Sequence, residues 1–110
     1  MSDALYKYLN RDGTCRYTNN PTRWPLPHNG QPGEWMPPIE GALRLHTNAY
    51  HAIKALHLPL WAGDALFELE YRGDRLDLST QVLLREARLL RPLTKQEGER
   101  AHRRRVVGAA

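Results

Sequence analysis

The sequence predicts one small α+β domain, in which a mostly antiparallel sheet carries one covering helix and is followed by a C-terminal helix. Three observations predict this class. Apolar and acidic residues alternate over 66–71, as in a half-buried strand. Six prolines within 19–41 exclude helices and central strands from that stretch. Thr94 and Glu97 have the spacing of a capping box at the start of a helix. We expect the sheet to contain residues 5–9, 15–18, 34–36, 42–46, 66–71 and 82–91.

The N-terminal segment reads as a hairpin. Residues 5–9 are aromatic and β-prone, and Asp12-Gly13 is a turn signal. Residues 15–18 would form the returning strand. The proline-rich segment 19–41 follows, and we expect an ordered, extended loop because Trp24 and Trp35 offer large apolar surfaces to bury.

Residues 42–46 alternate, with Leu43 and Leu45 opposite Arg44 and His46, which favours a strand. A helix is expected in the 48–61 region. Thr47 or Asn48 is a suitable cap for it, with Pro59 at its end. Its apolar face would then consist of Ala49, Ala52, Ile53 and Leu56.

The clearest strand is 66–71, where Phe67, Leu69 and Tyr71 point one way and Glu68 and Glu70 the other. Gly73-Asp74 is expected to close it with a turn. Segment 81–93 combines helix-favouring residues with a pattern that suits neither period, and strand is the preferred interpretation for 82–91.

We divide the chain into a domain at 1–93 and a basic C-terminal helix or tail at 94–110. The domain has eleven Lys and Arg against ten Asp and Glu, whereas the tail has five against two. Most of the net charge of +4 therefore belongs to the tail. A domain built to hold nucleic acid usually has a basic face across its fold, which this distribution does not predict.

Several features favour a cytoplasmic protein without a cofactor. Cys15 is the only cysteine, so no internal disulfide can form, and a reducing compartment fits best. No apolar run reaches the length of a membrane span, and the first residues lack a signal-peptide pattern. A chain of 110 residues has a modest core, with little room for a large cofactor.

The candidate polar site consists of two histidines and two glutamates. His46, His51 and His57 lie within twelve residues, but no CxxC or HxxxH pair preorganises a metal site, and no metal is predicted. Glu68 and Glu70 share a strand face, where paired carboxylates can divide acid and base roles or simply form ion pairs with Arg44 and Arg72. With Tyr50, His46 and Glu70 are also the residue types of a His-Tyr-Glu transferase site. The possible polar site is therefore His46, His51, Glu68 and Glu70.

Two further segments are candidate partner-binding surfaces. Arg100, Arg103, Arg104 and Arg105 form a basic cluster suited to phosphate or to an acidic protein surface. Trp24 lies in a Trp-Pro-Leu-Pro segment that a partner could bind as a rigid ligand, although packing into the protein's own core is the more ordinary role.

The order of several motifs resembles a family of small, functionally uncharacterised proteins of actinobacteria and their phages. The motifs are WPLP at 24–27, PGEW at 32–35, Leu45-His46 followed by His51, Leu58-Pro59 with Trp61, and Glu68-Leu69-Glu70. The family pattern has Cys, Gly, His and Cys where this chain has His46, Ala49, His51 and Ile53. The resemblance implies a later helix start, near Lys54, and a strand over 81–93.

The leading functional hypothesis is a non-enzymatic binding or modulator module, derived from a phage or mobile element, that acts on a host macromolecule. It depends on the small size, the missing catalytic constellation and the basic tail. The alternatives are a nucleic-acid-binding accessory protein that uses the tail, and a small enzyme that uses the His/Glu polar face.

Overall fold

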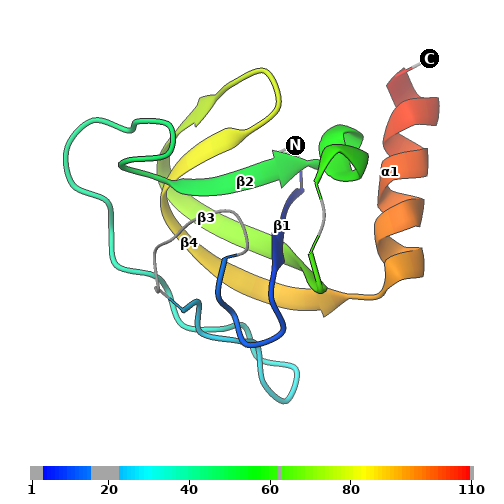
Figure 1. The fold of residues 1–110 in the computed structure, drawn as a ribbon, viewed down its shortest axis with the longest axis horizontal. Coiled ribbons are helices and arrows are strands. Elements are labelled where there is room, and N and C mark those ends of the chain that lie inside the picture. Colours follow the sequence, from blue (N-terminus) through cyan, green and yellow to red (C-terminus); the bar gives the residue numbers. More distant parts are fainter. Residues whose placement is uncertain (1–3, 16–22, 62, 110) are drawn as a thin grey trace.

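The protein is a small β-barrel with a helix along one side (Figure 1). The computed structural model describes residues 4–15, 23–61 and 63–109, with side chains to Val106. The expected α+β class is confirmed, with a four-strand antiparallel sheet and a C-terminal helix. The elements are β1 (Leu5–Leu9), β2 (Tyr50–Lys54), the 3-10 helix η1 (Ala55–Leu60), β3 (Ala65–Asp77), β4 (Val82–Leu93) and α1 (Lys95–Ala109).

The four strands close on themselves in the order β1-β2-β4-β3, and every pairing is antiparallel. β1 is hydrogen-bonded to β2 on one edge and to β3 on the other. A closed barrel leaves no exposed strand edge along these pairings. Its interior is filled mainly by aliphatic side chains of β1, β3 and β4, with Trp24 and Met36 added from the loop.

The strand expected at 66–71 is confirmed, and so is its facing. Phe67 and Leu69 are buried, while Glu68 is only partly buried. The strand does not end at Gly73-Asp74, as expected, but continues to Asp77. Gly73 has φ +82°, and the register with β4 shifts between Arg72 and Arg75. The glycine therefore marks an irregularity inside a long hairpin, because a residue with positive φ is accommodated there without a Cβ.

The first strand and the Asp12-Gly13 turn are confirmed, with Gly13 at φ +91° and its N–H donating to the carbonyl of Asn10. The returning strand is not found at Cys15, and 16–18 lie outside the described residues. Beyond that gap, the chain from 23 to 41 is extended and ordered without forming a helix or strand, as the prolines predict.

The strand expected at 34–36 is wrong, but the segment still runs along β4. The N–H groups of Gly33, Met36 and Ile39 donate to β4 carbonyls at 2.8–2.9 Å. Pro37 and Pro38 have no N–H to donate, so the bonds recur at every third residue and no regular ladder forms. This segment covers the part of β4 that β2 does not reach.

The strand expected at 42–46 is also wrong. The chain turns there, with paired backbone hydrogen bonds between Arg44 and Asn48. The Asn48 side chain donates to the carbonyls of Glu40 and Ala42, which fixes the turn. These local bonds compete successfully with a short alternating pattern.

The helix expected in the 48–61 region with Thr47 or Asn48 as its cap is wrong over its first part, and helical structure begins only after Lys54. Residues 50–54 are strand β2, and η1 is a 3-10 helix that contains Pro59. The strand interpretation of 82–91 is confirmed by β4.

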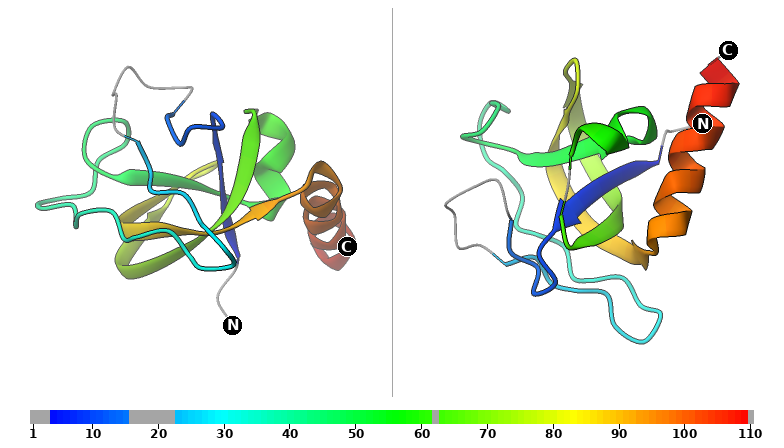
Figure 2. Two further views of the ribbon diagram at one scale, coloured as in Figure 1. Left: turned by 90° about the horizontal axis from the view of Figure 1, so that it is seen from below. Right: turned by 45° about the vertical axis from the view of Figure 1, so that its right-hand side comes forward.

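Helix α1 begins at Lys95, as the capping box predicts, and stands beside η1 (Figure 2). Gly98 is buried, and a Cβ on it would lie 2.6 Å from Cδ2 of Leu66, so the glycine permits close packing on β3. Ala101 packs against the cluster formed by Tyr6, Ile53, Leu58 and Leu66. The helix is thus attached to the barrel through its first turns. Within the described residues, no helix has the length and apolar character to span a membrane.

The capping box gives a direct test of this attachment. Thr94 Oγ1 accepts from the Glu97 N–H at 3.1 Å, and Glu97 Oε1 accepts from the Thr94 N–H at 3.0 Å. Thr94→Ala is expected to lower the free energy of unfolding by about 1 kcal/mol, because one orphan donor of the helix loses its partner. Chemical denaturation measures the change, with Ser79→Ala in the exposed turn as the control. An equal effect of both substitutions would argue against the cap.

Candidate functional site

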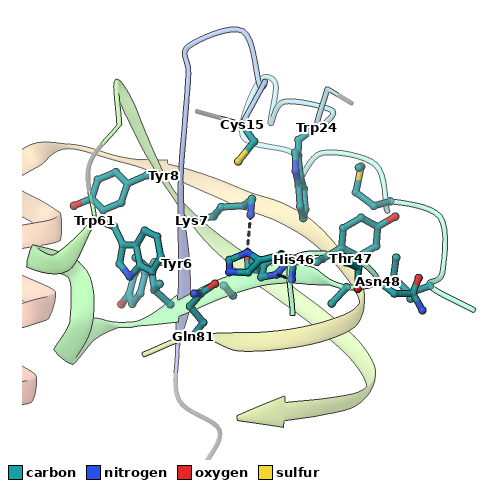
Figure 3. Close-up of a pocket in the computed structure, with 17 residues that line it drawn as sticks. Tyr6, Lys7, Tyr8, Cys15, Trp24, His46, Thr47, Asn48, Trp61 and Gln81 are labelled. Atoms are coloured by element: carbon teal, nitrogen blue, oxygen red, sulfur yellow. Dashed lines mark hydrogen bonds between the residues drawn. The ribbon is translucent and has the colours of Figure 1, made fainter. Parts of the chain in front are cut away.

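A pocket of about 310 Å³ opens between β1, β2 and the loop that precedes β2 (Figure 3). β1 contributes Lys7, and β2 contributes Tyr50 and His51. The loops contribute Cys15, Trp24, Met36 and His46. It is the larger of the two cavities described below, and it combines apolar walls with a few converging polar groups, the usual composition of a ligand site.

Lys7 is the central polar group of this pocket. In β1 it alternates with Leu5 and Leu9, which are 1% and 0% exposed, and it shares their inward direction with an exposure of 9%. Its Nζ donates to the carbonyl oxygen of His51 at 2.7 Å and lies 5.2 Å from the centre of the Trp24 ring. No carboxylate of the described residues forms an ion pair with it. Figure 3 shows the side chain pointing into the space between Cys15, Trp24 and His46.

Burial changes the protonation equilibrium of Lys7. Loss of solvent lowers the pKa of its amine from 10.5 to about 8, and the nearby Cys15 thiol opposes part of that effect. A buried lysine normally has an acidic partner, because an isolated ammonium is poorly stabilised away from water. Within 4–15, 23–61 and 63–109, the ammonium contacts one carbonyl oxygen and one aromatic face.

The His51 side chain holds the loop against the pocket. Its Nε2 accepts a hydrogen bond from the His46 N–H at 2.9 Å, which assigns the ring proton to Nδ1. The two imidazoles stack with centroids 5.5 Å apart, and His46 has φ +65°. Burial, with smaller contributions from Lys7 and His46, lowers the pKa of His51 from 6.5 to about 4. His51 is therefore neutral at neutral pH.

This neutral histidine predicts acid sensitivity. Between pH 6.5 and 4 the unfolded chain binds a proton at His51 that the folded protein does not, so stability falls as the pH falls through that window. We expect about 1–2 kcal/mol of this loss to disappear in His51→Gln, which keeps an acceptor but does not titrate. Denaturant unfolding across the window measures it, with His57→Gln on η1 as the control. Parallel pH profiles of the wild type and His51→Gln would contradict the assignment.

The apolar wall of the pocket is held rigidly. Trp24 contacts Tyr50 edge-to-face, with centroids 5.2 Å apart, and the Tyr50 hydroxyl donates to the carbonyl of Pro37. Trp24 belongs to the main core cluster, together with Met36. The wall therefore offers a preformed aromatic surface beside the Lys7 amine.

The four residues of the expected polar site do not share one surface. His46 and His51 line the pocket, whereas Glu68 and Glu70 belong to a row of cross-strand ion pairs between β3 and β4. Glu68 accepts from Arg91 and Glu70 from Arg88, each at 2.8 Å. The expected partners Arg44 and Arg72 are wrong for these glutamates, since Arg72 pairs with Glu86 at 2.9 Å.

The transferase-like set is divided in the same way. Tyr50 and His46 line the pocket, but Glu70 does not. His57 lies in η1, away from the other two histidines of the sequence cluster. No group of three or more potential metal ligands gathers in the described part of the chain.

The basic residues of α1 form a separate feature. Arg100 and Arg104 line a second cavity of about 120 Å³ together with Tyr6 and Arg91. Arg91 also pairs with Glu97 at 3.3 Å. Arg103 and Arg105 are exposed on the same helix. Two of the four expected arginines therefore converge with a third from β4.

Lys7 itself was not singled out from the sequence. The pattern that indicates it is Leu5-Tyr6-Lys7-Tyr8-Leu9, in which a lysine occupies the face shared by two leucines. In a strand, residues two apart point the same way, so this lysine is inward whenever the leucines are. The neighbouring residues Tyr6 and Tyr8 are also largely apolar, so the segment shows no clear alternation and the inward position of Lys7 is hard to recognise.

The two tryptophan-containing motifs at 24–27 and 32–35 lie in different places, the first at the pocket and the second outside it. The first, at 24–27, supplies the Trp24 wall, and the second ends in Trp35, which the guanidinium groups of Arg72 and Arg88 cover at 4.1 and 4.7 Å from the ring centre. No protein-family model, curated protein or solved structure matches this chain.

Proposed function

We propose that this chain is a small, non-enzymatic binding module whose pocket takes a single-ring ligand with a negatively charged group. The observation that carries the proposal is the buried Lys7 ammonium, which pairs with no carboxylate among the described residues. A ligand carboxylate would supply the missing charge, and its ring would lie against Trp24 and Tyr50. The volume of about 310 Å³ is near the lower limit for ligand pockets and suits one ring.

The test is a calorimetric titration with benzoate and with benzamide, which has the same shape without the charge. Benzoate is expected to bind more tightly than benzamide, and Lys7→Met is expected to abolish the difference. Lys95→Met removes an equal charge from exposed α1 and should leave binding unchanged. Equal affinity for the two compounds, or no binding of benzoate, would overturn the proposal.

The wider setting of this module is also a proposal. That it acts on a host macromolecule is supported by its small size and its basic tail, and the resemblance supports an origin in a phage or mobile element. A cytoplasmic location is supported by the single cysteine. A small enzyme built on His46, His51, Glu68 and Glu70 has less support, because the glutamates are engaged with arginines outside the pocket.

A second candidate function is nucleic-acid binding through α1, favoured by the convergence of Arg91, Arg100 and Arg104. Each phosphate contact would add a salt-dependent increment of affinity. The double substitution Arg100→Glu and Arg104→Glu is expected to weaken retention on heparin and reduce its salt dependence, while Arg44→Glu in the exposed turn is the control. Equal retention of both variants would exclude this surface. Charge reversal is preferable to truncation, which would uncover Leu66.

A further inference from the structure

We propose that the Lys7 amine reacts reversibly with the carbonyl carbon of a small aromatic aldehyde in the pocket and forms an imine. This activity goes beyond anion binding but rests on the proposed function in one respect, since both require a small ligand to reach Lys7. The imine would make the pocket a carbonyl-capturing site.

The first support is the position of the amine. Lys7 lines the pocket, and its side chain extends from an inward-facing position of β1, where pairing with β2 and β3 fixes the backbone. Nζ has one hydrogen-bond partner, the His51 carbonyl at 2.7 Å, and no acidic partner among the described residues. A neutral amine can keep that hydrogen bond while its lone pair is free to attack a carbonyl carbon.

The second support is the surroundings of the amine. Burial favours the neutral form, and with a pKa of about 8 roughly a quarter of the amine is unprotonated about half a pH unit below that value. An ordinary exposed lysine is unprotonated there to only about one part in a thousand. Desolvation of this kind is how proteins activate lysine as a nucleophile.

The third support is the shape of the wall. Trp24 and Tyr50 are held edge-to-face, and Met36 lies in the same buried cluster as Trp24. An aromatic aldehyde can place its ring against this wall and its carbonyl carbon toward Nζ. An aliphatic aldehyde would gain less from these contacts.

The reaction is balanced without an oxidant or a reductant. The nitrogen lone pair attacks the carbonyl carbon, and the C=O π electrons move to oxygen, which takes a proton. The resulting carbinolamine loses its oxygen as water, and the two hydrogens of that water account for the two N–H hydrogens of the neutral amine. The product is a C=N bond at Nζ, and hydrolysis reverses the step.

The sequence makes the test sharp, because the chain has only three lysines, Lys7, Lys54 and Lys95. The full chain is incubated with benzaldehyde and sodium cyanoborohydride, which reduces an imine to a stable benzylamine. Peptide mass mapping then gives the rate of labelling at each lysine. Lys54 is ion-paired with Asp77 at 2.9 Å, and Lys95 is exposed on α1, so these two serve as internal references.

We expect Lys7 to be labelled at least about tenfold faster than Lys95, given its larger unprotonated fraction. The rate advantage should vanish in denaturant, where all three lysines have the same surroundings. Labelling of Lys95 as fast as Lys7 in the folded protein would overturn the inference. Because the labelling is mapped on the wild type, the result does not depend on any variant folding.

Two variants distinguish this inference from the proposed function. Lys7→Arg keeps the positive charge but has no nucleophilic amine under these conditions, so it should still prefer benzoate over benzamide while the Lys7 label is lost. Lys7→Met should lose both. Benzoate binding without selective labelling would overturn the imine alone, and selective labelling without benzoate binding would overturn the anion proposal alone.

Discussion

Lys7→Met is expected to stabilise the folded protein at neutral pH while removing the preference for an anionic ligand. The change of the Lys7 pKa from 10.5 to about 8 corresponds to about 3 kcal/mol of unfavourable free energy for the charged folded state. Methionine removes that cost but leaves the His51 carbonyl without its donor, which costs about 1–2 kcal/mol. The net expectation is a gain of about 1–2 kcal/mol.

The pH dependence of the free energy of unfolding tests this account of Lys7. Well below pH 8 the amine is charged in both the folded and the unfolded state, and the full cost is present. Between pH 8 and 10.5 the unfolded chain holds a proton that the folded protein has lost, so wild-type stability from this group rises with pH. The advantage of Lys7→Met should therefore shrink across that window. Denaturant unfolding of both proteins measures it, with Lys95→Met as the control. A destabilised variant with an unchanged pH profile would refute the account of Lys7.

Trp24→Ala is expected to cause the largest loss of stability, about 3–5 kcal/mol. The ring is 5% exposed and belongs to the main core cluster. Its removal also deletes the edge contact with Tyr50 and the aromatic face under the Lys7 ammonium. Thermal and chemical denaturation measure the change.

Trp35→Ala is the matched control for this prediction. Trp35 is only partly buried, and its ring lies against the guanidinium groups of Arg72 and Arg88, on residues of β3 and β4. Cation–π contacts at exposed sites contribute about 0.5–1 kcal/mol, so the loss should be much smaller. If both substitutions cost the same, Trp24 does not anchor the core as described.

Strand β3 and the start of helix α1 could be predicted because each is determined by a strong local pattern in the sequence. Phe67, Glu68 and Leu69 alternate because β3 has one face in the barrel, and the Thr94 cap acts within one helical turn. Residues 42–46 carried a similar pattern over only a few positions, yet Leu45 is 40% exposed there. In that segment the Asn48 side-chain bonds decide the structure, and no periodicity in the sequence reports them.

Strand β2 was obscured for a different reason. Ala52 and Ile53 are consecutive and both buried, because Ala52 packs in the main cluster and Ile53 in the cluster beneath α1. A strand buried on both faces loses its alternation, and its apolar residues then fit a helical spacing equally well. The candidate site could not be predicted from the sequence either. Lys7 contacts His51 and Trp24 only because the barrel closes, and strand pairing over such distances is not visible in the local pattern.

The strand that carries Lys7, β1, also closes the barrel. Because β1 pairs with β2 on one edge and with β3 on the other, the circuit of hydrogen bonds is complete only when β1 is bound to both strands. A ligand that binds the Lys7 side chain would therefore stabilise the pairing of β1 with β2 and β3. Ligand binding at Lys7 should therefore slow amide hydrogen exchange along β1 more than along the β3–β4 hairpin, because a bound ligand stabilises the strand that it contacts. Hydrogen-exchange measurements with and without the ligand show this difference without a spectroscopic label.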